Sequence, residues 1–301
     1  MQESNIKHFL QLHFIVFIWG FTAILGKLIS IDSIPLVWYR MLLAVMFVLV
    51  YFVIKKKHFS IDTKSLLKFI LTGTIIALHW IAFFEAIKVS TVSIALVTMS
   101  TGAFFTSLLE PLFFRRRIKM IEIVLGLLVI GGLYIIFSFE TQYALGIFYA
   151  LAASFLSAIF SVLNGLFVKR NDAEVISFYQ LLFGVLFVTV FLFFTNGFST
   201  EFFSLSSIDW FYLVVLSSIC TAYAFIASVK VMKYLTPYSV MLTMNLEPIY
   251  AIVLALIIFG DKEKMKPEFY YGAFMVLFVV LFNGIIKNRR AIHQKMKMNK
   301  N

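Results

Sequence analysis

Two glutamates, Glu110 and Glu247, stand in apolar stretches, and each is followed by a proline. Counted from Pro237 at about 1.5 Å per residue, Glu247 lies about 15 Å into its segment, which is the depth of a bilayer centre. Glu110 lies four residues before Phe114 and a run of arginines, so it can reach water. A carboxylate at the bilayer centre costs about 3 kcal/mol or more unless it faces a cavity, finds a partner or takes up a proton. Glu247 is therefore a candidate for substrate binding or ion coupling, and Glu110 reads as an interfacial, structural acid.

Pro248, the residue after Glu247, adds to the prediction that this part of the segment has a special role. Proline has no N–H, so the carbonyl of Met244 loses its helical partner and the helix should kink at this point. Two interpretations of Glu247 stay open. It lines a cavity and takes part in binding, coupling or gating, or it is protonated and braces the kink against a neighbouring helix.

His79 and Arg40 are the next candidates. His79 also falls near the midplane, where an imidazole can bind substrate or exchange protons, or simply bond two helices together. Arg40 lies five residues into its segment from the predicted outer side. Its long side chain can extend to the surface, or it can pair with Glu85 as an outer gate. Lys88, three residues after Glu85, is a rival partner for that glutamate.

Other polar or aromatic residues inside the apolar segments complete the predicted lining of a substrate cavity. They are Trp80, Thr98, Asn164, Tyr223, Thr243 and Asn245. Asn164 can also serve as a hydrogen bond between helices. The five histidines are scattered, the chain has a single cysteine, and no glycine-rich phosphate loop precedes a lysine. The sequence therefore predicts neither a metal site nor a cofactor, and it predicts a protein that is not an enzyme.

Composition places these residues in a membrane protein. The 301 residues are 61% hydrophobic and 14% charged, whereas a soluble domain carries about 25% charged residues. The net charge of +11 could suggest a nucleic-acid partner. However, the basic residues lie between apolar runs, where they read better as anchors at a membrane surface, so the predicted partners are the lipid bilayer and a small-molecule substrate.

Ten apolar segments are each about long enough to cross the membrane as helices. They are 9–29, 35–54, 66–87, 90–114, 121–139, 143–168, 175–195, 209–230, 236–259 and 268–287. With both termini in the cytoplasm, 20 basic residues lie at cytoplasmic ends and five at outer ends. This asymmetry predicts that both termini are cytoplasmic, with 288–301 as a basic tail.

The two halves of the chain are similar in sequence. Shifting 71–119 by 145 residues onto 216–264 pairs eleven identical residues, including Thr98 with Thr243. Each unit has five spans. Because five is an odd number, the second unit must be inverted in the membrane relative to the first. The predicted units are 9–139 and 143–287. Inverted repeats are typical of secondary transporters, whose substrate site lies near the midplane between the repeats.

Several motifs resemble those of one family. Trp19-Gly20 resembles a first-span W-G, Tyr39-Arg40 a second-span arginine motif, and 234–261 an L-T-P…L-E-P motif that ends in an acidic residue, here Asp261. Together they resemble the drug/metabolite transporter superfamily, in its ten-helix form with two EamA-type repeats. In the first repeat Ala103 replaces the expected proline, so a matching break in the fourth span is not implied.

The resemblance implies a multi-pass permease of the inner (plasma) membrane that exports small metabolites, such as amino acids or drug-like compounds, by alternating access. Coupling to protons or another ion is the favoured hypothesis for Glu247 and His79. Two alternatives stay open. One is the exchange of nucleotide sugars or sugar phosphates, for which Arg40 is the available deep cation. The other is a lipid-handling protein that transports no solute.

Overall fold

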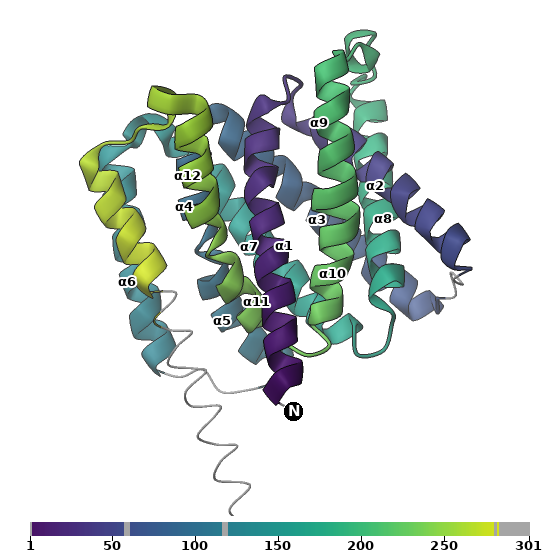
Figure 1. The fold of residues 1–301 in the computed structure, drawn as a ribbon, viewed down its shortest axis with the longest axis horizontal. Coiled ribbons are helices and arrows are strands. Elements are labelled where there is room, and N and C mark those ends of the chain that lie inside the picture. Colours follow the sequence, from purple (N-terminus) through teal and green to yellow (C-terminus); the bar gives the residue numbers. More distant parts are fainter. Residues whose placement is uncertain (1, 57–60, 116–119, 280–281, 283–301) are drawn as a thin grey trace, which may run out of the picture.

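The chain folds into helices of very different lengths (Figure 1). The computed structural model describes residues 2–56, 61–115, 120–279 and 282. The first half contains α1 (Gln2–Leu28), α2 (Ser33–Lys55), α3 (Thr63–Val89), α4 (Val92–Met99), α5 (Gly102–Phe113) and α6 (Met120–Phe139). The second half contains α7 (Ala144–Phe167), α8 (Ala173–Phe194), α9 (Ser207–Ser217), the π-helix η3 (Ser218–Tyr223), α10 (Ala224–Val231), α11 (Pro237–Met244), α12 (Glu247–Phe259) and a helix over Pro267–Val279. Short 3-10 turns are η1 (Thr141–Tyr143), η2 (Glu201–Phe203) and η4 (Gly260–Glu263). The predicted tail 288–301 and the end of the tenth predicted span lie outside the described residues.

These helices form membrane spans. Eight stretches of the described chain are long and apolar enough to cross a bilayer, and two shorter apolar helices, Leu127–Phe139 and Pro267–Val279, accompany them. Large apolar side chains cover the outside, among them Phe194 at 78% exposure and Ile257 at 75%, as a surface that faces lipid requires. The prediction of an all-α membrane protein with ten apolar helices is confirmed. The side of the membrane that each terminus occupies stays a prediction.

Two of the spans are broken near their middle, at matching positions. The span over Val92–Phe113 consists of α4 and α5, and the span over Pro237–Glu263 consists of α11, α12 and η4. The shift of 145 residues that relates the two halves in sequence carries α4 onto α11 and the first residue of α5 onto the first residue of α12. The fourth span therefore breaks as the ninth does, although its proline is missing.

Each break has its own chemical cause. In the ninth span, the helix before the break, α11, begins at a Thr236 cap. The helix after the break, α12, has Pro248 in its first turn, where the missing N–H of proline costs least. In the fourth span, hydroxyl groups replace the proline. Thr101 Oγ1 donates to the carbonyl of Thr98 at 2.7 Å, and Ser154 Oγ on α7 donates to the carbonyl of Met99 at 3.2 Å. Hydroxyls that bond the backbone in this way compete with the helical ladder and stabilise the turn.

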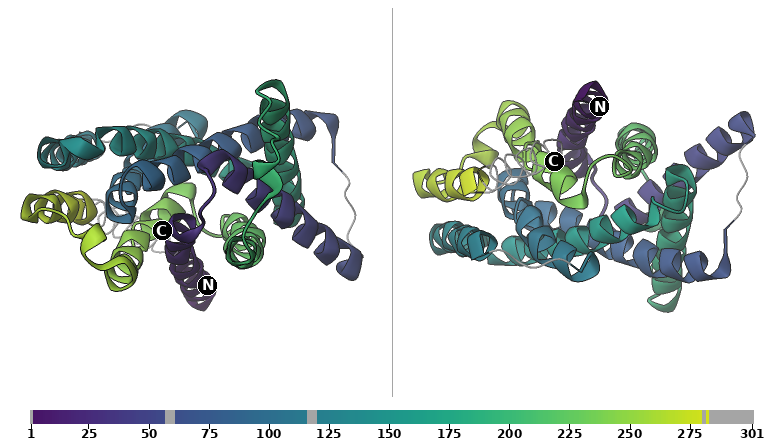
Figure 2. Two further views of the ribbon diagram at one scale, coloured as in Figure 1. Left: turned by 90° about the horizontal axis from the view of Figure 1, so that it is seen from above. Right: turned by 90° about the horizontal axis from the view of Figure 1, so that it is seen from below.

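The helices pack around α3, which contacts α7 and α8 most extensively. The fifth-span helix α6 and the helix Pro267–Val279 lie together at one edge of the bundle (Figures 1 and 2). Gly132 and Gly272 allow this pair to approach closely, because a Cβ atom added at Gly272 would lie 2.9 Å from the carbonyl oxygen of Gly132. Small residues commonly permit such contacts between membrane helices. The edge pair leaves the other spans to surround the centre.

One end of the bundle is tied by buried acids. Glu263, 1% exposed, accepts hydrogen bonds from the backbone N–H groups of Val92 and Ser93 at 3.1 Å each, and it thereby caps α4. At the same end, Glu140 accepts a bond from the backbone N–H of Lys266 at 3.0 Å. The family-like motif pointed to Asp261 as the acid at this position of the chain. The structure places Asp261 on the surface, paired with Lys264 at 2.6 Å.

Glu263→Ala should lower the free energy of unfolding by about 1–3 kcal/mol, because the first N–H groups of α4 lose their buried acceptor. The matched control is Asp261→Ala, which removes an exposed ion pair and should change stability by less than about 1 kcal/mol. Both values can be measured by unfolding titrations in mixed detergent micelles. Equal losses in the two variants would contradict the capping role of Glu263.

Candidate functional site

A cavity of about 70 Å³ lies at the centre of the bundle, beside the ninth-span break. Its walls come from α1, α2, α3, α4, α7, η3, α10, α11 and the first residue of α12. Arg40 and Glu247 are the ionic side chains of its lining, and the imidazole of His79 lines it as well. Trp80 and Asn164 line it too, so the cavity brings together five of the residues that the sequence predicted, from four different spans.

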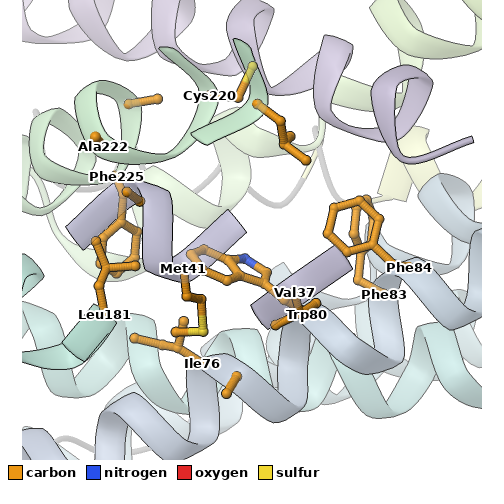
Figure 3. Packing of buried hydrophobic residues seen from close by; sticks show 14 of the residues in the cluster. Val37, Met41, Ile76, Trp80, Phe83, Phe84, Leu181, Cys220, Ala222 and Phe225 are labelled. Carbon is orange, nitrogen blue, oxygen red and sulfur yellow. The ribbon is translucent and has the colours of Figure 1, made fainter. Parts of the chain in front are cut away.

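Arg40 is fixed in one orientation. The side chain is 2% exposed, Nε donates to Thr221 Oγ1 at 2.7 Å, and the guanidinium carbon lies 3.9 Å from the ring centroid of Trp80. Figure 3 shows Trp80 with Phe225 on one side and Phe84 on the other. Stacking and one hydrogen bond leave part of the guanidinium unused, since Nη1 has no hydrogen-bond partner among the described residues. A buried cationic donor with a free N–H is suited to binding an anionic group.

Glu247 faces the same cavity. It is the first residue of α12 and is partly exposed to the cavity. Arg40 and Glu247 interact electrostatically, yet within the described ranges no hydrogen bond or ion pair within 4.0 Å reaches the Glu247 carboxylate. A brace needs a bonded partner and a cavity residue does not, but the choice between the two interpretations of Glu247 stays a prediction.

His79 both bonds two helices and lines the cavity. Its Nδ1 lies 2.7 Å from the carbonyl oxygen of Ala153 on α7. Because a carbonyl oxygen can only accept, Nδ1 carries the hydrogen. In the neutral ring Nε2 is then an acceptor. The ring packs against Phe83 and Phe160, which also line the cavity.

Polar residues on α7 form a stripe along the cavity that the sequence reading found only in part. Ser157, Ser161 and Asn164 all line it, and Asn164 also accepts a hydrogen bond from Gln180 Nε2 at 2.6 Å. In the part of the chain that the structure describes, Asn164 Nδ2 finds no hydrogen-bond partner. Spacings of four and three residues place these side chains on one helix face, so the stripe was readable from sequence as a polar face within an apolar span. Thr22 and Cys220 are further lining residues outside the predicted set.

Several predicted residues lie away from the cavity. Thr98 and Asn245 are buried at the two breaks, Thr243 donates to the carbonyl of Ser239 at 3.0 Å, and Tyr223 is 49% exposed on the outer face of η3. Glu85 accepts a hydrogen bond from Ser33 at 2.5 Å. The structure therefore does not bring Glu85 to Arg40, because Arg40 points inward to Thr221 and Trp80.

The rest of the wall is apolar and adaptable. Aromatic side chains of α1, α3, α7 and α10 alternate with Met99, Met232 and Met244. Methionine is flexible and fills irregular space, so it can move when a guest enters. The present volume admits a few water molecules but is smaller than the roughly 300–1,000 Å³ of sites for drug-sized ligands. A bound metabolite must therefore be small, or the methionine side chains must change conformation to make room for it.

Comparisons with known proteins agree with this architecture. A family profile described as the EamA-like transporter family matches residues 9–138 and 144–285. A solved structure, described only as the crystal structure of a protein, superposes with a TM-score of 0.67 at 13% identity, over 92% of this chain and 96% of the other. At that identity the likeness shows the fold alone. No curated protein matches the chain.

The position of Glu247 can be tested with the accessibility of an introduced cysteine. In a Cys220→Ala background, a cysteine in Glu247→Cys should react with methyl methanethiosulfonate at least about tenfold faster than a cysteine in Thr98→Cys, because thiol reactivity requires access. Thr98 is fully buried and lies outside the cavity lining, so it is the matched control. Mass spectrometry of the folded protein measures both rates. Equal rates would favour the bracing interpretation.

Proposed function

Because the chain belongs to the EamA-like transporter family and is therefore a membrane transporter, we propose that its central cavity carries a small zwitterionic metabolite with an apolar body, such as an amino acid. One observation supports this substrate class above the others. A cationic donor, Arg40 Nη1, and the Glu247 carboxylate, which makes no ion pair with the described residues, share one cavity whose remaining walls are largely aromatic and thioether side chains.

Each part of such a substrate has a counterpart in the cavity. A carboxylate can accept from Arg40 Nη1 in a charge-assisted bond, and an ammonium group can approach Glu247. The apolar part can pack among Phe83, Phe160 and Phe225. Amides and hydroxyls of α7 can hold water or further polar groups.

We assign the conformational change of the transport cycle to the two broken spans. In the proposed cycle, two inverted five-helix units expose the cavity to one side of the membrane and then to the other, and the breaks act as hinges. The favoured direction is export. Protonation of Glu247 removes its charge and its attraction to Arg40, which is a direct way to couple proton movement to substrate release.

Replacement of Arg40 tests the substrate class. In proteoliposomes, Arg40→Gln should weaken substrate affinity roughly 10- to 100-fold, which corresponds to the loss of a hydrogen bond to a charged group. Arg170→Gln removes an exposed arginine at the end of α7 and should leave affinity unchanged. The substrate is first found by screening amino acids and phosphate esters for protection of Cys220, the single cysteine, against a thiol reagent.

Protection by phosphate esters rather than amino acids would favour the exchanger alternative. Protection by neither, together with stabilisation by lipids alone, would favour the lipid-handling alternative. Thermal unfolding of Arg40→Gln controls for misfolding, since Arg40 also contacts Thr221 and Trp80. The more conservative Arg40→Lys keeps the charge and should retain part of the affinity.

The pH dependence of transport tests the role of Glu247. Glu247→Gln should remove most of the pH dependence of transport, because glutamine keeps the shape of the side chain but cannot exchange a proton. Glu110→Gln is the matched control in the other Leu-Glu-Pro sequence and should keep the wild-type pH profile. Initial rates in proteoliposomes across pH 5.5–8.5 measure both. A Glu247→Gln transporter with the wild-type pH profile would rule out coupling through this carboxyl.

A further inference from the structure

A second, larger groove is separated from the central cavity by the eighth of the ten predicted spans, Ser207–Val231, which consists of α9, η3 and α10. This groove has a volume of about 460 Å³ and lies between α1, α2, α8 and the η3–α10 segment. The eighth span separates the two spaces. Cys220 and Phe225 line the central cavity, whereas Ala222 and Ile226 line the groove.

The groove is polar at one end and apolar along its length. Gln11, Tyr51, Glu174 and Lys230 lie within about one helical turn of the span ends, at the end of the bundle that carries the N-terminus of α1. From Lys230 the lining continues through Ile226 and Ala222 to Ser218, twelve residues away. At about 1.5 Å per residue that distance is about 18 Å, which is a little more than half of a hydrocarbon core about 30 Å thick. The groove therefore extends through one leaflet.

The shape and chemistry of the walls suit an extended hydrocarbon chain. Ala222 and Ala227, 7% and 6% exposed, contribute small side chains to the wall, beside the larger Tyr223 and Ile226. Phe47 and Tyr223, 37% and 49% exposed, present apolar edges to the same space. A groove of this kind within spans that face lipid offers apolar contacts to a guest that is itself apolar and elongated.

The charged residues at the polar end of the groove indicate which polar group the bound molecule carries. Lys230 is exposed at the polar end, whereas Glu174 is 8% exposed and has an interaction within the protein. We propose that the groove is a binding site for one anionic phospholipid, with an acyl chain along η3–α10 and its phosphate at Lys230. A lysine near the membrane surface favours an anionic lipid by about fivefold. The site is independent of which solute the central cavity binds.

Native mass spectrometry of the full chain, released from micelles that contain phosphatidylglycerol or phosphatidylcholine, tests the site. The wild type should retain one phosphatidylglycerol, at least about threefold more often than one phosphatidylcholine. Lys230→Glu should abolish that preference, and Ala227→Trp should reduce retention of either lipid by filling the groove. The matched controls are Lys233→Glu, which reverses a charge outside the groove, and Val214→Trp, which enlarges an exposed side chain of the same span.

Thermal unfolding before each measurement identifies any variant that has lost its fold, and Lys230→Glu, at an exposed position, keeps the test valid if Ala227→Trp fails. Retention in both groove variants equal to that in both controls would overturn the proposal. Dimeric ions of the wild type that Ala227→Trp removes would overturn it in favour of a second copy of this chain in the groove. Binding is read without transport, so failure here is distinct from failure of the proposed function.

Discussion

Every backbone N–H and C=O group in the membrane core must find a partner inside the protein, and the two broken spans are where this chain meets that constraint most severely. The first break is closed by neighbours, because Ser154 on α7 bonds both Thr101 Oγ1 at 2.8 Å and the Met99 carbonyl. At the second break Glu247, the first residue of α12, faces the cavity. Two breaks at equivalent positions thus have different consequences. Hydroxyl groups of the protein close the first break, whereas the second presents one carboxylate to the cavity.

The two charged side chains beside the second break, Arg40 and Glu247, differ in how firmly the protein holds them. A charge buried in a membrane is costly, and removal of one partner leaves the other without compensation. Arg40 is held by Thr221 and by the face of Trp80, while Glu247 is held by neither hydrogen bond nor ion pair in the part of the chain described. A fixed cation opposite a free carboxylate is a poor arrangement for stability alone. It is a good arrangement for a site in which the carboxylate changes its partner.

Much of this organisation was predictable from sequence, and the reasons for the exceptions are physical. Hydropathy gave the spans, since a helix must cover about 30 Å of hydrocarbon. Depth singled out Glu247 and His79 because midplane polar groups seldom face lipid. The orientation of Arg40 was not predictable, because a long side chain near a span end can reach water or the interior equally well. Tyr223 fell on the opposite face because the π-helix η3 shifts the register of its span.

The two ends of the bundle join the two halves of the chain through different contacts, and this bears on how the cavity opens. At the end that carries Glu263, a buried carboxylate of the second half bonds the first half, and at the end that carries Asn164 and Met232 the ammonium group of Lys169 lies over the ring of Phe114. The cavity extends toward this second end through Asn164, Ser228 and Met232.

Under the proposed alternating access, opening the opposite end requires α12 and η4 to separate from α4, and thus Glu263 to release its cap. The hinge for that movement is the turn between α11 and α12, and Glu247 is the first residue beyond it. A guest that draws the Glu247 carboxylate toward itself therefore pulls directly on the segment that must move. Binding and opening are then coupled through one residue, without the need for a longer pathway between them.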